Sequence, residues 1–174
     1  MDGEGNIMVL TIFTLAHVVV SLLGVVSGFV VLFGLLAGKR LARWTALFLA
    51  TTVATSVTGF FFPVHRFMPS HAVGILSLLV LAVAIYARYA RHLAGGWRKA
   101  YVVSAVIAFY LNVFVGIVQA FQKVPALKDL APTQSEPPFK ITQLLVLILF
   151  VAFAIIGAIR FRMEPVRSAL DANP

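Results

Sequence analysis

The chain has 174 residues, of which 61% are hydrophobic and 11% charged, and its mean hydropathy is +0.99. This composition excludes an ordinary water-soluble domain and indicates that a lipid bilayer is the solvent. The sequence contains no Cys, which excludes disulfides, Cys-ligated iron–sulfur clusters, thiolate zinc sites and a cysteine nucleophile. At this length we expect one small helical bundle.

Five stretches of the sequence are long and apolar enough to cross a bilayer, which takes about 20 residues at about 1.5 Å per residue. They cover residues 7–37, 44–62, 71–89, 100–122 and 141–159. We therefore predict an all-α, polytopic membrane bundle with five transmembrane helices in residues 1–162, followed by a tail of residues 163–174. The proline-rich segment 123–140 is typical of an extended extracytoplasmic loop with one short surface helix.

The basic residues predict the orientation of the bundle. One side of the membrane receives Lys39, Arg40, Arg43, Arg88, Arg91, Arg98, Lys99, Arg160, Arg162 and Arg167, and the other side receives Arg66, Lys123, Lys128 and Lys140. The positive-inside rule then places the amino terminus outside and the carboxyl terminus in the cytoplasm. We expect a multi-pass protein of the inner (plasma) membrane, whose basic loops contact lipid headgroups and not nucleic acid.

Four polar residues of different spans share one depth. His17, His71, Gln119 and Gln143 each lie about 17 to 22 residues from the basic boundary of their own span, so their heights agree to within about 8 Å. Polar side chains are expensive in lipid, and those inside spans often mark functional sites. We therefore predict a polar site near the outer leaflet.

Imidazoles from separate helices are typical axial ligands of a b-type haem. We expect His17 and His71 to ligate the iron, with His65 as a further candidate metal ligand. Gly24 and Gly28 share a helical stripe with His17 and would admit the flat macrocycle. The amides expected around the cofactor are Asn112, Gln119 and Gln143.

This pattern of His17 on the first span and His71 at the start of the third resembles small bacterial b-type cytochrome-like proteins and other multi-helix integral membrane proteins. The resemblance covers residues 7–122. It implies a membrane redox protein, and we expect haem-based or quinone-linked electron transfer.

Other interpretations remain open. His17 would be structural if it were hydrogen-bonded to Gln143 or Asn112 across a helix interface. A small-solute transporter would use Asn112, while an accessory or assembly subunit, or a homodimer, would pack through Gly24 and Gly28. A hydrolase is disfavoured because no acidic residue lies inside a span to orient a histidine.

Overall fold

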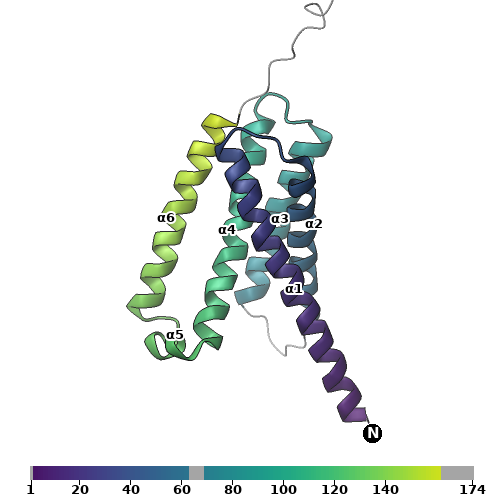
Figure 1. Ribbon diagram of the computed structural model, residues 1–174, viewed down its shortest axis with the longest axis vertical. Coiled ribbons are helices and arrows are strands. Elements are labelled where there is room, and N and C mark those ends of the chain that lie inside the picture. Colours follow the sequence, from purple (N-terminus) through teal and green to yellow (C-terminus); the bar gives the residue numbers. More distant parts are fainter. Residues whose placement is uncertain (1, 63–68, 162–174) are drawn as a thin grey trace, which may run out of the picture.

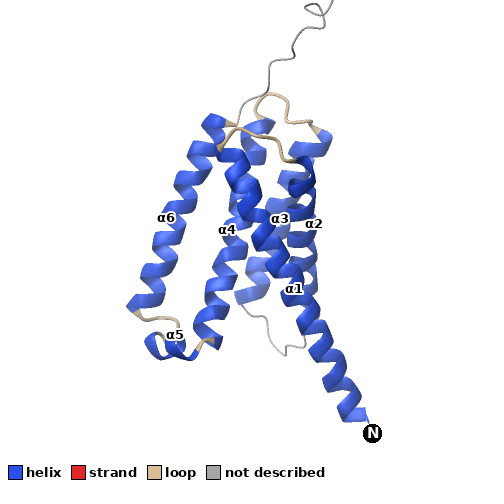
Figure 2. Cartoon of the chain, in the orientation of Figure 1, coloured by secondary structure: helices blue, strands red, loops and turns tan. Residues whose placement is uncertain are grey.

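The computed structural model describes residues 2–62 and 69–161, and this part of the chain is helical, without strands (Figures 1 and 2). The helices are α1 (Asp2–Leu36), α2 (Ala42–Thr58), α3 (Pro69–Ile85), α4 (Trp97–Lys123), α5 (Pro125–Leu130) and α6 (Pro137–Arg160). A 3₁₀ turn, η1 (Gly59–Phe61), extends α2, and a π-helical turn, η2 (Tyr86–Ala90), extends α3. All helices except the short α5 are long and apolar enough to cross a membrane, which confirms the predicted five spans.

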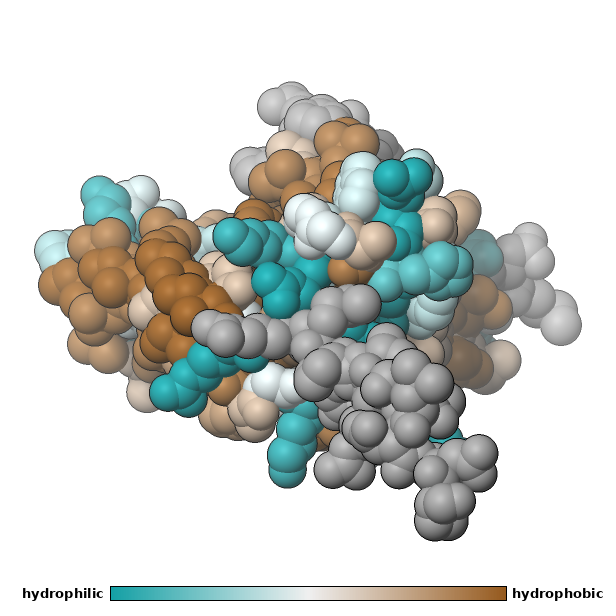
Figure 3. Space-filling model, turned by 90° about the horizontal axis from the view of Figure 1, so that it is seen from above, coloured by the Kyte–Doolittle hydropathy of each residue, from teal (hydrophilic) through white to brown (hydrophobic). Residues whose placement is uncertain are grey.

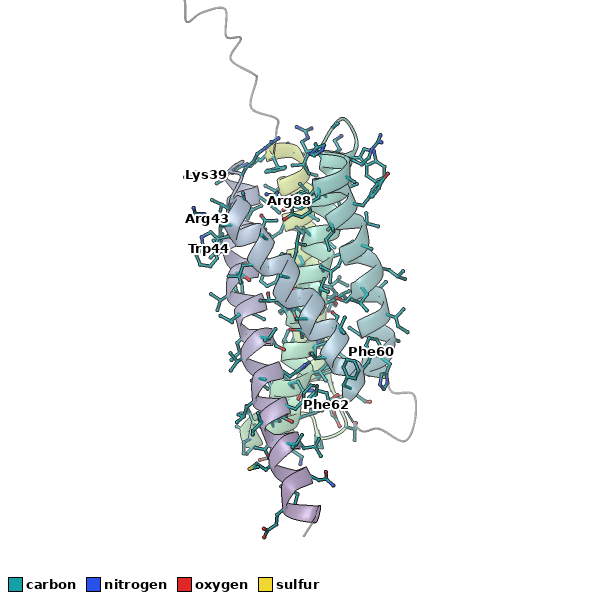
Figure 4. The ribbon with its side chains drawn as sticks, turned by 90° about the vertical axis from the view of Figure 1, so that its right-hand side faces the viewer. Lys39, Arg43, Trp44, Phe60, Phe62 and Arg88 are labelled. Carbon is teal, nitrogen blue, oxygen red and sulfur yellow. The ribbon has the colours of Figure 1, made fainter. Side chains whose placement is uncertain are left out.

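The five long helices run side by side, and α4 is the central one. It packs on α3, α6 and α1, while α1 packs most extensively on α2. One end of the bundle, which we call the basic end, carries Lys39, Arg43 and Arg88 (Figure 4). The opposite end, which we call the α5 end, carries α5 and the amino terminus (Figure 1).

Large aliphatic side chains cover the outside of the bundle, as expected for helices surrounded by lipid. Between the helices lie small and aromatic residues, because close packing replaces the hydrophobic effect as the force that joins helices in a membrane. Phe109 of α4 occupies the centre, with the rings of Phe29, Phe48 and Phe150 at 4.9, 5.9 and 5.3 Å from its own. Gly28 of α1 lies directly against this ring.

Helix α1 is longer than its neighbours. Its 35 residues span about 52 Å, well beyond a hydrocarbon core of about 30 Å. At the basic end Gly38 lies beside the Arg160 carbonyl, so α1 and α6 end at a similar height. Residues 2–12 therefore extend beyond the other end of α6, as the projecting amino-terminal part of α1 shows in Figure 1.

The helix boundaries differ from the predicted ones at several ends. The second span is α-helical only as far as Thr58 and then tightens into η1, whereas the fourth begins at Trp97 and the fifth at Pro137. Hydropathy detects the apolar core of a span, but not the interfacial turn that continues it. The tail 163–174 lies outside the described residues.

Candidate functional site

His17 lies on α1 at the α5 end and faces the last turn of α2. Its side chain is half-buried, and its Nδ1 lies 2.7 Å from Oγ1 of Thr58. The hydrogen bond joins two spans across a helix interface. The partner differs from the one expected, because it is neither Gln143 nor Asn112.

The hydrogen bonds of Thr58 indicate which ring nitrogen of His17 carries the proton. The Thr58 hydroxyl donates to its own helix, at 2.7 Å from the Ala54 carbonyl and 3.3 Å from the Thr55 carbonyl. A hydroxyl has a single proton, so Oγ1 of Thr58 acts as acceptor toward the imidazole. We infer that His17 donates from Nδ1 and that its Nε2 carries the free lone pair.

Aromatic rings surround His17. The Phe62 ring stands edge-on to the imidazole at 5.0 Å, and Phe13 packs against Phe62 at the same distance. Figure 4 shows Phe62 and Phe60 at the α5 end of the bundle. These rings limit the access of water to one side of the imidazole.

His71 lies in the first turn of α3 and meets the same short segment of chain. Its ring is 5.6 Å from that of Phe60, which also packs on Gly74 one helical turn further along α3. His17 and His71 therefore both pack on the segment that follows α2, each against a different phenylalanine. His65 lies outside the described residues.

The side-chain amide of Asn112 lies away from His17. Asn112 donates to Thr52 at 3.4 Å, and its Nδ2 lies against Gly24. Because Thr52 precedes Thr58 by six residues, this pair lies about 9 Å deeper in the bundle than the His17 pair. Asn112 of α4 thus contacts α2 through Thr52 and α1 through Gly24.

The two glutamines also differ from each other. Gln143 of α6 is only 8% exposed, and its Nε2 donates to the Phe114 carbonyl of α4 at 3.3 Å. Its buried Oε1 has no hydrogen-bond partner among the described residues. Gln119, by contrast, is exposed, although it shares the predicted depth of Gln143.

Gly24 and Gly28 serve close helix packing. A Cβ at Gly24 would lie 3.0 Å from Asn112 Nδ2, and a Cβ at Gly28 would lie 2.5 Å from the Phe109 ring. The stripe expected to admit a macrocycle is therefore filled by side chains of α4.

Thr58 is the site residue that sequence reasoning missed. A signal was present, because hydroxyl residues recur along α2 at Thr51, Thr55 and Thr58, on the side that meets α1. Ser21 lies one helical turn from His17 toward the basic end, and its hydroxyl is 3.3 Å from the Thr55 hydroxyl. Ser56 donates to Ser77 of α3 at 3.0 Å, so α2 makes polar contacts with both of its neighbours.

Within residues 2–62 and 69–161, His, Asp and Glu side chains do not gather in a group of three or more that would hold a metal ion. An axial haem site needs only imidazoles from two positions and is a different arrangement. No protein-family model, curated protein or solved structure matches this chain.

Proposed function

We propose that this protein is a membrane redox protein that binds a b-type haem at the α5 end, where His17 and His71 would hold the iron. The observation that carries the proposal is the 2.7 Å hydrogen bond between His17 Nδ1 and Thr58, in which we infer that the imidazole donates. Metal-ligating histidines almost always donate their second ring nitrogen to an acceptor, which fixes the tautomer and the ring orientation. With Thr58 as the acceptor, Nε2 would be the nitrogen that ligates the iron.

Two imidazoles are suitable ligands for the iron of a haem. Gly24 and Gly28, however, do not leave space for the porphyrin ring. Both imidazoles pack on phenylalanines of the segment after α2, an apolar setting that suits a porphyrin. Gly24 and Gly28 are occupied by Asn112 and Phe109, so we place the proposed site at Phe60 and Phe62. When bound, the haem would supply one-electron transfer, possible partners being a quinone or a larger membrane complex.

Two side chains of this site would support His17 without binding the haem iron themselves. Thr58 positions His17, and Phe62 shields one side of the imidazole from water. The further hydrogen bond of Ser21 to the His17 carbonyl, at 2.7 Å, holds the helix turn that carries the histidine.

The test is titration of haem into purified protein, followed by the Soret band. We expect His17→Ala and His71→Ala each to weaken binding strongly and to shift the spectrum. His92→Asn is the matched control, because His92 lies at the basic end in a left-handed conformation (φ 49°) that Asn tolerates. Absence of haem binding by the wild type, or equal loss in the control, would overturn the proposal.

Thr58 allows a finer test. Thr58→Ser keeps the hydroxyl acceptor, whereas the isosteric Thr58→Val removes it. We expect the serine variant to bind haem as the wild type does and the valine variant to show weaker binding with a changed spectrum. Equal behaviour of the two variants would show that Thr58 does not position the ligand.

A second candidate is an accessory or assembly subunit, and the projecting part of α1 favours it. Ile7, Met8 and Val9 are 67%, 61% and 63% exposed on the part of α1 that extends past α6. Successive apolar residues cover all sides of a helix, and such a helix is normally buried. If the protein is such a subunit, it should migrate on native gels as part of a larger complex, and Ile7→Asn with Val9→Asn should dissociate it from that complex. Leu130→Asn on α5 is the control and should leave the complex intact. An unchanged complex in the double variant, or no complex with the wild type, argues against this role.

A further inference from the structure

An apolar groove runs between α4 and α6 on the lipid-facing side. Its volume is about 820 Å³, and its walls include Val103, Ile107 and Tyr110 of α4 and Leu147, Val151 and Ile155 of α6. This volume lies in the range of sites that hold small organic ligands. In a bilayer the groove faces acyl chains.

The groove has cations at one end only. Arg98 and Lys99, in the first turn of α4, line its mouth at the basic end. From Lys99 to Tyr110 the groove follows α4 for about 16 Å, which is close to half of a hydrocarbon core of about 30 Å. The apolar part thus matches the depth of one leaflet, and the cations match the level of its headgroups.

Arg98 and Lys99 differ from two other cations of the basic end, which lie over aromatic rings. Arg88 lies over the Tyr101 ring at 5.4 Å, and Arg91 lies over the Trp97 ring at 5.5 Å. Arg98 and Lys99 have no hydrogen bond, ion pair or ring contact among the described residues. Within the part of the chain that the structure describes, neither charge is already paired.

Within residues 2–62 and 69–161, the charged side chains around the groove mouth are all basic. The described cations of the basic end are Lys39, Arg40, Arg43, Arg88, Arg91, Arg98, Lys99 and Arg160. The acids whose side chains the structure describes, Glu4, Asp129 and Glu136, lie on the projecting part of α1 or at the α5 end. Figure 3 looks onto the basic end and shows hydrophilic side chains gathered above the bundle, with hydrophobic ones around them.

We propose that the groove between α4 and α6 binds one anionic phospholipid, with its phosphate at Arg98 and Lys99 and an acyl chain along the apolar walls. Basic pockets between transmembrane helices are recognised sites for anionic headgroups. A neutral lipophile would fill the groove but would gain little from the two cations. The inference is independent of the haem proposal, because it concerns the opposite end of the bundle.

The experiment compares phosphatidylglycerol with phosphatidylcholine of the same acyl chains, added to the full chain in detergent and read by native mass spectrometry. We expect phosphatidylglycerol to bind more tightly. Arg98→Gln with Lys99→Gln should weaken its binding about 30-fold and leave phosphatidylcholine binding unchanged. The matched control, Lys39→Gln with Arg43→Gln, removes the same charge elsewhere at the basic end and should retain most of the binding.

A second variant tests the groove itself. Ala154→Leu places a larger side chain in the wall and should weaken phosphatidylglycerol binding while both cations remain. Inorganic phosphate alone should not compete at millimolar concentration, because it lacks the acyl chain. Equal binding of the two lipids, an equal loss in the Lys39 and Arg43 control, or full competition by phosphate would each overturn the proposal.

Discussion

Replacement of Gly28 by alanine tests whether α1 and α4 pack as closely as the structure shows. The new Cβ would lie 2.5, 2.6 and 3.0 Å from three atoms of the Phe109 ring, whereas carbon atoms prefer a separation of about 3.5 to 4.0 Å. The ring would have to move by about 1 Å. Phe109 is only 2% exposed and is held by Phe29, Phe48 and Phe150, so it has little room.

The expected cost follows from two opposing effects. Overpacking of a filled core costs about 1–3 kcal/mol. Removing a glycine from a helix returns about 0.5–1 kcal/mol. We therefore expect Gly28→Ala to lower the free energy of unfolding by about 0.5–2 kcal/mol.

Gly116→Ala on α4 is the matched control, because a Cβ there would meet nothing within 4 Å. It should be neutral or slightly stabilising. Unfolding can be followed in mixed micelles of increasing SDS content by the fluorescence of Trp44 and Trp97. In a Phe109→Leu background, the cost of Gly28→Ala should largely disappear. Equal stability of Gly28→Ala and Gly116→Ala, or no coupling to Phe109, would refute the packing.

The other predictions use different readouts. Because the chain has no Cys, Ser135→Cys should react with an impermeant maleimide in intact cells and Gly95→Cys only after lysis; the reverse pattern would invert the predicted topology. Gln143→Leu removes a buried oxygen without a partner but also the 3.3 Å hydrogen bond to the Phe114 carbonyl, so the thermal midpoint should change little; a large loss would contradict this. Desolvation raises the pKa of Glu136, but hydrogen bonds from Thr133 and Ser135 outweigh it and hold that pKa below the ordinary 4.5. The stabilisation by the Glu136 carboxylate is therefore present above its ordinary pKa and is lost as the pH falls through its lowered pKa. The wild type should be more stable than Glu136→Gln at neutral pH, and this difference in the free energy of unfolding should vanish in acid. A difference that does not change with pH would contradict the prediction.

The sequence was sufficient for the architecture. Runs of about 20 apolar residues have few structural alternatives in a bilayer, because only a helix satisfies every backbone group within its own segment. The five spans were predictable for this reason. Their ends were less so, because Gly59–Phe61 continues α2 as a 3₁₀ turn that hydropathy does not distinguish from helix.

The candidate site was only partly predictable. The depth of His17 and Gln143 follows from counting residues, but the direction of each side chain depends on how the helices rotate against one another. Gln119 shares their depth and is nevertheless exposed, while Asn112 pairs with Thr52 deeper in the bundle. Small residues admit either a ligand or a neighbouring helix, and only the packed structure shows that Gly28 meets a phenylalanine.

The most direct measurement is ¹⁵N NMR of the His17 ring in the purified protein, before and after addition of haem. We expect the proton on Nδ1, where Thr58 accepts it, and a strong change of the unprotonated Nε2 when haem is added. A proton on Nε2 in the free protein, or an Nε2 signal that haem leaves unchanged, would contradict His17 as the ligand.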